Sequence, residues 1–101
     1  MITKNNFIEN LFLTIEKRAK GKSSKSYTKK LIKGGKKKIS QKFGEESNEL
    51  IIDYLKGTKK RTIEEAADVI YHLLVLLYSK KIKLKEIEKE LTKRSKNVRQ
   101  R

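Results

Sequence analysis

The chain has 101 residues, with 27 Lys and Arg against 12 Asp and Glu, so its formal net charge at pH 7 is +15. This length corresponds to one domain near the lower end of what builds a good core alone. Only 36% of the residues are hydrophobic, so we expect a second copy of the chain to complete the core. The absence of cysteine excludes disulfides and thiolate metal sites.

No membrane or secretion signal is recognisable in the sequence. The first twenty residues carry Glu9 and Glu16 within their apolar pattern and have no small-residue cleavage site. The longest apolar run, Val69 to Tyr78, is too short to span a bilayer. We therefore expect a cytoplasmic protein with no membrane partner.

The first half of the chain is expected to form helices separated by a loop. Proline is absent and glycine is scarce, which favours long helices. The stretch NNFIENLFLTIEKRAKG places apolar side chains on one helical face: Phe7, Ile8, Leu11, Phe12 and Ile15. Gly21 and KSSKS indicate a loop. The stretch YTKKLIK then predicts a short helical turn that is broken at Gly34-Gly35.

Three further helices are expected in the second half. The first runs from about Lys36 to Lys56 and ends at Gly57; its expected inward residues are Ile39, Phe43, Leu50, Ile51, Tyr54 and Leu55. Thr62-Ile63-Glu64-Glu65 has the form of a capping box and predicts a helix from there to about Ser79. The last helix is expected near Leu84 to Lys93. The pattern indicates an all-α, antiparallel bundle of four main helices, with a domain over residues 1–95 and a frayed basic tail over 96–101.

Acidic residues are concentrated in one part of this basic chain, since seven of the twelve lie between Glu45 and Asp68. At 100° per residue, Glu45, Glu46 and Glu49 share one side of their helix. On the next helix Glu65 and Asp68 are three residues apart, within a segment that is otherwise nearly all apolar. Two antiparallel neighbours would bring the two sets face to face.

Carboxylates gathered in one pocket repel each other unless a cation compensates them. Mg²⁺ prefers oxygen ligands and leaves coordination positions for water and phosphate. The five acids therefore predict an Mg²⁺ site at which a polyphosphate is bridged and a water is activated.

Simpler interpretations exist for each residue taken alone. Glu65 could be only the partner of Thr62 in a capping box, and the three glutamates of the first set could be a solvated helix face. Asp68 is harder to explain in this way, because burying a bare carboxylate in apolar surroundings is costly. His72 is expected to be a hydrogen-bonded core residue with a supporting role, such as orienting a carboxylate.

Residues 17 to 44 contain twelve Lys or Arg and no acid. Lysine charge and backbone N–H groups near Gly34-Gly35 could neutralise phosphates. The same excess permits non-specific nucleic-acid binding. It also fits a general drift of composition toward lysine.

Longer motifs resemble a known family. SYTKKLIKGGKKKISQKFGEESNE followed by EEAADVIYHLLVLL is similar to phosphoribosyl-ATP pyrophosphohydrolase of histidine biosynthesis, a member of the all-α NTP pyrophosphatase group that includes the MazG-type proteins. The resemblance covers about residues 5 to 93. E-E-x-x-E with E-x-x-D marks the wider group, whereas SYT, K-x-G-E-E and AAD-x-x-YHLLVLL are more specific to the histidine branch.

The resemblance implies Mg²⁺-dependent hydrolysis of the α–β phosphoanhydride of 1-(5-phosphoribosyl)-ATP to phosphoribosyl-AMP and pyrophosphate, by a homodimer. It implies that the catalytic, metal-binding acids are Glu45, Glu46, Glu49, Glu65 and Asp68. It also implies that the substrate-binding residues are Ser26, Tyr27, Thr28, Lys38 and Lys42. The family often has acids or alanines where this chain has KGTKKRT and GKSSKS, so the lysines of these loops need not contact substrate.

Two alternatives remain open beside this leading hypothesis. The first is a general (d)NTP pyrophosphatase of the same fold, against which SYT and YHLLVLL argue. The second is a non-catalytic, basic helical protein that binds RNA. Five clustered carboxylates would repel a phosphate backbone, and few aromatic residues lie among the lysines to stack on bases, so no specific nucleic-acid partner is expected.

Overall fold

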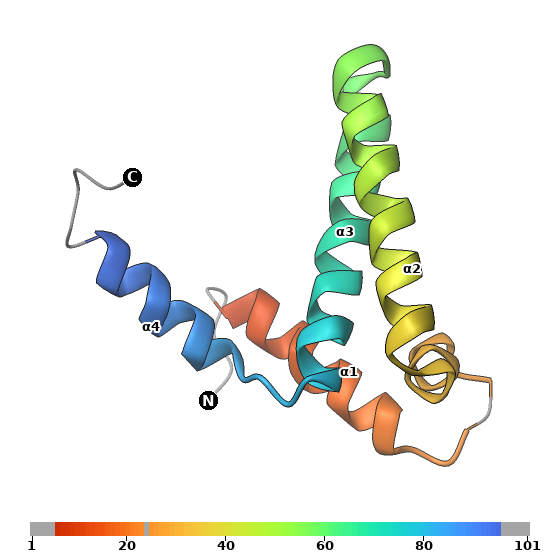
Figure 1. Cartoon of the computed structure of the whole chain (residues 1–101), viewed down its shortest axis with the longest axis vertical. Helices are drawn as coiled ribbons and strands as arrows, with labels where there is room; N and C mark the ends of the chain where they lie inside the picture. Colours follow the sequence, from red (N-terminus) through yellow and green to blue (C-terminus); the bar gives the residue numbers. More distant parts are fainter. Residues whose placement is uncertain (1–5, 24, 96–101) are drawn as a thin grey trace.

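The computed structural model describes residues 6–23 and 25–95, and these fold entirely into helices and connecting turns (Figure 1). In chain order the elements are α1 (Phe7–Lys20), α2 (Tyr27–Lys56), α3 (Lys59–Ser79) and α4 (Leu84–Ser95). The predicted all-α class with four main helices is therefore confirmed over the described ranges. Within the same ranges, no helix combines the length and the apolar character that crossing a membrane requires.

Helices α2 and α3 form a long antiparallel hairpin, and α1 crosses its base (Figure 1). Helix α3 packs against both α1 and α2, as its apolar sequence predicted. The core lies at the base, where the side chains of Leu74, Val75 and Leu77 meet those of Phe12, Ile15, Leu31 and Ile39. Helix α4 contributes no fully buried residue and contacts this core only through half-buried side chains such as Leu84 and Ile87.

Helix α2 bends at Gly35, as the Gly34-Gly35 pair predicted. Gly35 has φ 82° and ψ −178°, a conformation outside the helical region that glycine adopts without strain. Ser26 caps the first segment by accepting a hydrogen bond from the Lys29 backbone N–H. The bend lets this segment bury Thr28 and Leu31 at the base, while the second segment runs beside α3 as the outer part of the hairpin.

The prediction that a capping box at Thr62 opens α3 is wrong. The helix begins at Lys59, and Thr58 is its N-cap, with its hydroxyl accepting from the Arg61 backbone N–H at 3.1 Å. Thr62 lies within the first turns, where its hydroxyl donates to the backbone carbonyl of Asp53 at 3.1 Å. That contact ties α3 to the end of α2, so Thr62 has an inter-helix role in place of the expected cap.

The end of the last helix also differs from expectation. Helix α4 extends to Ser95, two residues beyond the predicted end, and includes Arg94, whose guanidinium binds Glu90 at 3.0 Å. The predicted frayed tail over residues 96–101 lies outside the described residues.

Several apolar residues predicted to face inward are exposed in this single chain. On the outer half of α2, Tyr54 is 76% exposed, and Leu55 and Ile51 are also more than half exposed. On α1, Phe7 and Ile8 are exposed too. The outer half of α2 has α3 beside it on one side only, so one chain cannot cover an apolar surface this wide.

Candidate active site

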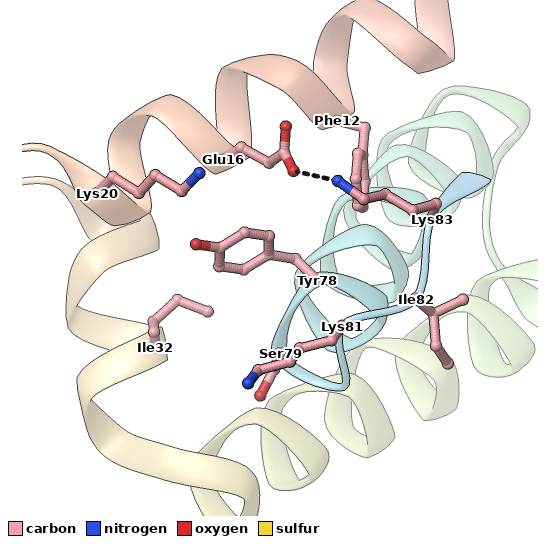
Figure 2. A pocket seen from close by; sticks show the side chains of 9 residues that line it. All are labelled: Phe12, Glu16, Lys20, Ile32, Tyr78, Ser79, Lys81, Ile82 and Lys83. Atoms are coloured by element: carbon pink, nitrogen blue, oxygen red, sulfur yellow. Dashed lines mark hydrogen bonds and ion pairs between the residues drawn. The ribbon is translucent and has the colours of Figure 1, made fainter. Parts of the chain in front are cut away.

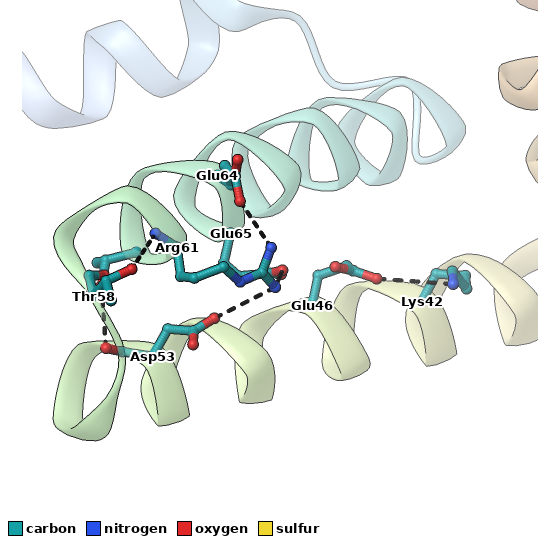
Figure 3. A network of polar contacts seen from close by, with 8 residues as sticks. Lys42, Glu46, Asp53, Thr58, Arg61, Glu64 and Glu65 are labelled. Carbon is teal, nitrogen blue, oxygen red and sulfur yellow. Dashed lines mark hydrogen bonds and ion pairs between the residues drawn. The ribbon is translucent and has the colours of Figure 1, made fainter.

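The acids of α2 and α3 converge on Glu65. Ligand oxygens of Glu46, Glu65 and Asp68 lie within 4.8 Å of one another, and so do those of Glu49, Asp53 and Glu65. Figure 3 shows Glu46 and Asp53 on α2 flanking Glu65 on the facing helix. The predicted meeting of the two acidic sets is thus present for four of the five acids. Glu45 belongs to neither group.

Glu65 is the buried acid of the site, with only 7% of its surface exposed. Burial and the facing Glu46 side chain raise the pKa of Glu65 above its ordinary value, although the Arg61 guanidinium opposes this shift. Asp68, by contrast, is exposed. The expectation that Asp68 is the costly buried carboxylate is therefore wrong, because Asp68 lies at the solvent-exposed side of the cluster and the cost of burial falls on Glu65.

An arginine partly compensates these acids. The Arg61 guanidinium donates to Glu65 Oε2 at 2.7 Å and to Glu64 Oε1 at 2.8 Å, and it lies 3.8 Å from Asp53 Oδ2 (Figure 3). These carboxylates, with Glu64 first, raise the pKa of Arg61. The guanidinium brings one positive charge to the Asp53 end of the cluster.

Asp53 and Arg61 were not predicted as site residues, although the spacing of each in the sequence indicates its position. Asp53 follows Glu49 by four residues, and Arg61 precedes Glu65 by four. Residues four apart share one helix face. Both therefore lie on the faces that the predicted acids define.

The donor set fits a hard divalent cation. All the clustered groups are carboxylates, the oxygen ligands that Mg²⁺ prefers. In addition, Asp53 Oδ2 and Glu65 Oε1 are buried and have no hydrogen-bond partner within residues 6–23 and 25–95. Buried polar atoms are normally hydrogen-bonded. Two buried carboxylate oxygens without a hydrogen bond, one of which has only the Arg61 guanidinium at 3.8 Å, are therefore the kind of groups that a bound cation would satisfy. The cluster thus has the carboxylate ligands that a site for a divalent cation would need.

Lysines flank the cluster on the α2 side. The Lys42 ammonium lies 3.5 Å from Glu45 Oε1 and 3.8 Å from Glu46 Oε2. Glu45 also accepts from the Gln41 amide at 3.1 Å, and this hydrogen bond is the main cause that lowers the pKa of Glu45. Lys38 is exposed one helical turn before Lys42 and lowers the pKa of Glu45 further.

The Ser26-Tyr27-Thr28 segment lies against α3 just beyond Asp68. The Tyr27 hydroxyl contacts His72 Nε2 at 2.9 Å, and the Thr28 hydroxyl is hydrogen-bonded to the Tyr71 hydroxyl. The rings of Tyr27 and Tyr71 stack with centroids 6.1 Å apart. Thus SYT and the Y-H of YHLLVLL form one contact region next to the acids, and His72 is the hydrogen-bonded, buried residue that the sequence predicted.

A separate pocket of about 410 Å³ lies at the base of the fold (Figure 2). Its lining includes Phe12, Ile32 and Tyr78, and a Glu16–Lys83 ion pair of 3.5 Å lies at its edge. No predicted site residue lines it. This pocket is therefore separate from the acidic cluster.

Comparison with known proteins decides the family. Residues 8–95 match the phosphoribosyl-ATP pyrophosphohydrolase family. The chain belongs to this family. It is 41% identical over 87 residues to the histidine biosynthesis bifunctional protein HisIE of Staphylococcus aureus (strain Mu50) and 47% identical over 87 residues to that of Staphylococcus epidermidis (strain ATCC 35984).

These alignments cover 86% of this chain but 41% of each relative. The chain therefore spans about two fifths of the length of the curated relatives that it matches. Family membership confirms the resemblance predicted from SYT, K-x-G-E-E and AAD-x-x-YHLLVLL. It favours this hypothesis over both the general (d)NTP pyrophosphatase and the RNA-binding protein.

Proposed function

We propose that this chain hydrolyses the α–β phosphoanhydride of 1-(5-phosphoribosyl)-ATP to phosphoribosyl-AMP and pyrophosphate, and that it requires Mg²⁺. One observation carries the proposal. In this member of the family, two sets of carboxylates share Glu65, and the ligand oxygens of each set lie within 4.8 Å of one another. When bound, Mg²⁺ would supply positive charge for the phosphates and a metal-bound water.

The chain's own acids take different parts in this proposal. Glu46, Glu65 and Asp68 form one ligand group, and Glu49 joins Glu65 and Asp53 in the other. Arg61 holds one oxygen of Glu65 and leaves Oε1 available to a cation. For Glu45, predicted as a ligand, we propose that it holds the Lys42 ammonium beside Glu46, since that is the contact it makes.

The predicted substrate residues also divide by their surroundings. Lys38 and Lys42 follow one face of α2 next to the acids, where their charge can neutralise phosphate oxygens. Tyr27 is 47% exposed and can contact a nucleotide directly. Ser26 and Thr28 are engaged within the protein, in a helix cap and in the hydrogen bond to Tyr71, so we propose that they position Tyr27.

We further propose that the chain acts as a cytoplasmic homodimer with no specific nucleic-acid partner. The α2–α3 hairpin exposes a set of large apolar side chains that a second copy would cover: Ile51, Ile52, Tyr54, Leu55, Ile63, Ile70 and Leu73. Monomeric proteins seldom leave large contiguous apolar patches exposed. Isologous pairing of such hairpins would form a larger helical bundle.

The test is an assay of purified protein with phosphoribosyl-ATP against a panel of NTPs, in Mg²⁺ and in EDTA. We expect turnover only with phosphoribosyl-ATP and Mg²⁺, and a higher melting temperature in Mg²⁺. Full activity in EDTA together with identical melting curves would contradict the metal requirement. Preference for a free NTP would favour the general pyrophosphatase.

Asp68→Asn tests the acid cluster itself. The change is nearly isosteric and removes one ligand charge, so the fold should persist while turnover falls by roughly two orders of magnitude, the scale of a lost electrostatic contribution. Glu88→Gln, which neutralises an exposed acid on α4, is the matched control and should keep turnover. Wild-type turnover of Asp68→Asn at saturating Mg²⁺ would show that the cluster is not the catalytic site.

A further inference from the structure

His72 is the single histidine of the chain, and it is 5% exposed. Its ring lies edge-on to Tyr71, with centroids 5.1 Å apart, and to Tyr27, at 5.9 Å. Both ring nitrogens have partners. Nδ1 lies 2.7 Å from the backbone carbonyl oxygen of Asp68, and Nε2 lies 2.9 Å from the Tyr27 hydroxyl.

These two contacts determine the direction of the hydrogen bonds. A carbonyl oxygen can only accept, so Nδ1 must carry the hydrogen that joins it to Asp68. In a neutral imidazole the other nitrogen then has no hydrogen and can only accept. With His72 in this neutral tautomer, the Tyr27 hydroxyl therefore donates to His72 Nε2.

The hydroxyl hydrogen of Tyr27 is thus used inside the protein, while its oxygen keeps lone pairs for another donor. Tyr27 is half exposed, and its surroundings include Lys42, Glu46 and Asp68. Burial raises the pKa of Tyr27, which keeps the phenol protonated and able to donate. A phenol oriented in this way cannot donate to a phosphate oxygen, but it can accept from a hydroxyl or an N–H group.

We propose that His72 is a positioning residue that fixes Tyr27 as a hydrogen-bond acceptor beside the acid cluster, for a hydroxyl or N–H donor of the bound nucleotide. The phosphates of the nucleotide would then be bound by the cationic groups of the site, and not by the Tyr27 hydroxyl. This inference rests on the proposed function for its ligand, but the arrangement of Asp68, His72 and Tyr27 can be measured without substrate or metal.

The first experiment reads the tautomer directly. Protein labelled with ¹⁵N-histidine gives the resonances of a single imidazole. Long-range ¹H–¹⁵N correlation at pH 8 therefore shows without ambiguity which ring nitrogen carries the hydrogen. We expect the Nδ1–H tautomer. In Tyr27→Phe this tautomer should remain, because the Asp68 carbonyl is unchanged, while the Nε2 resonance should shift as it loses its donor. An Nε2–H tautomer, or an Nε2 resonance unaffected by Tyr27→Phe, would overturn the proposal whatever the enzyme's activity.

The second experiment separates positioning from structure. His72→Asn keeps an amide N–H near the Nδ1 position and removes the acceptor at Nε2. Losing one hydrogen bond should raise KM for the nucleotide by roughly three- to tenfold with little change in kcat, and Tyr27→Phe should do the same. Tyr78→Phe, which removes a phenol hydroxyl elsewhere on α3, is the control and should leave KM unchanged.

The double variant His72→Asn/Tyr27→Phe completes a cycle. If His72 acts through Tyr27, the double variant should be no worse than either single variant, because both remove the same interaction. His72→Gln can present its amide oxygen near the Nε2 position and should recover part of the loss. Additive effects on KM would refute the proposal. So would an increase of KM in His72→Asn that is explained by its lower melting temperature alone, because His72 would then have only a structural role.

Discussion

Gly35→Ala should destabilise the protein through backbone strain alone. Gly35 has φ 82° and ψ −178°, a region that is essentially restricted to glycine. A Cβ added there would meet no atom within 4 Å, so steric clash contributes nothing. A residue held in such a region costs about 1–3 kcal/mol.

Relaxing the bend would not relieve this cost. If residue 35 adopted helical angles, the first segment of α2 would turn away from the base and expose Thr28 and Leu31, which are both buried. Exposing a buried leucine alone costs about 1.5–3 kcal/mol. The strain should therefore stay, and at roughly 4–8 °C per kcal/mol for a domain of this size the melting temperature should fall by at least about 4 °C.

Gly44→Ala is the matched control. Gly44 lies in the regular part of α2, and a Cβ there also meets nothing within 4 Å. Alanine is preferred over glycine in a helix interior by roughly 0.5–1 kcal/mol, so this variant should be more stable than wild type. Thermal melts in EDTA and urea titrations measure both. A Gly35→Ala protein as stable as wild type, or two variants that shift in the same direction, would refute the reasoning.

Three further predictions concern the site and the assembly. The raised pKa of Glu65 means that the folded state favours the protonated carboxyl group. In EDTA, the stability that this group provides is therefore present at acidic pH and is lost as pH rises from 4.5 through the raised pKa of the folded state. Glu65→Gln should melt increasingly higher than wild type over that range, and a difference independent of pH would contradict this. Arg61→Gln should lower the melting temperature in EDTA but much less in Mg²⁺, because the metal ion replaces the missing positive charge. Lys60→Gln is the control. An equal decrease for Arg61→Gln in both buffers would contradict this prediction. Light scattering at tens of micromolar should give a dimer that Leu55→Glu weakens, whereas a wild-type monomer would disprove the assembly.

The helices could be predicted from periodicity because their apolar residues recur at helical spacing and few glycines interrupt them. Their caps were harder to predict. Thr58 and Thr62 are both threonines near the start of α3, and Thr62 has the stronger local pattern because Glu65 follows three residues later. Thr58 is nevertheless the cap, since the chain leaves α2 at Gly57 and must turn there.

The acidic cluster could be predicted because helical spacing alone brings carboxylates to a shared face. Which carboxylate of the cluster is buried depends on how α3 is rotated against α2, and this rotation leaves Glu65 buried and Asp68 exposed to solvent. Contacts such as that of Tyr27 with His72 join residues 45 positions apart. No local pattern encodes such a pairing. Likewise, an apolar residue such as Tyr54 has the same pattern whether its own chain or a partner covers it.

The loose attachment of α4 has a consequence for how the protein opens. Its twelve residues bury no side chain completely, so few contacts must break before its backbone amides meet water. Amide hydrogen exchange should therefore occur in α4 by local opening, with a free energy well below that of global unfolding. The amides around Val75 on α3, which is fully buried, should exchange only when the whole domain unfolds. The chain would then contain two cooperative units, a slow-exchanging body formed by α1, α2 and α3 and a fast-exchanging C-terminal helix.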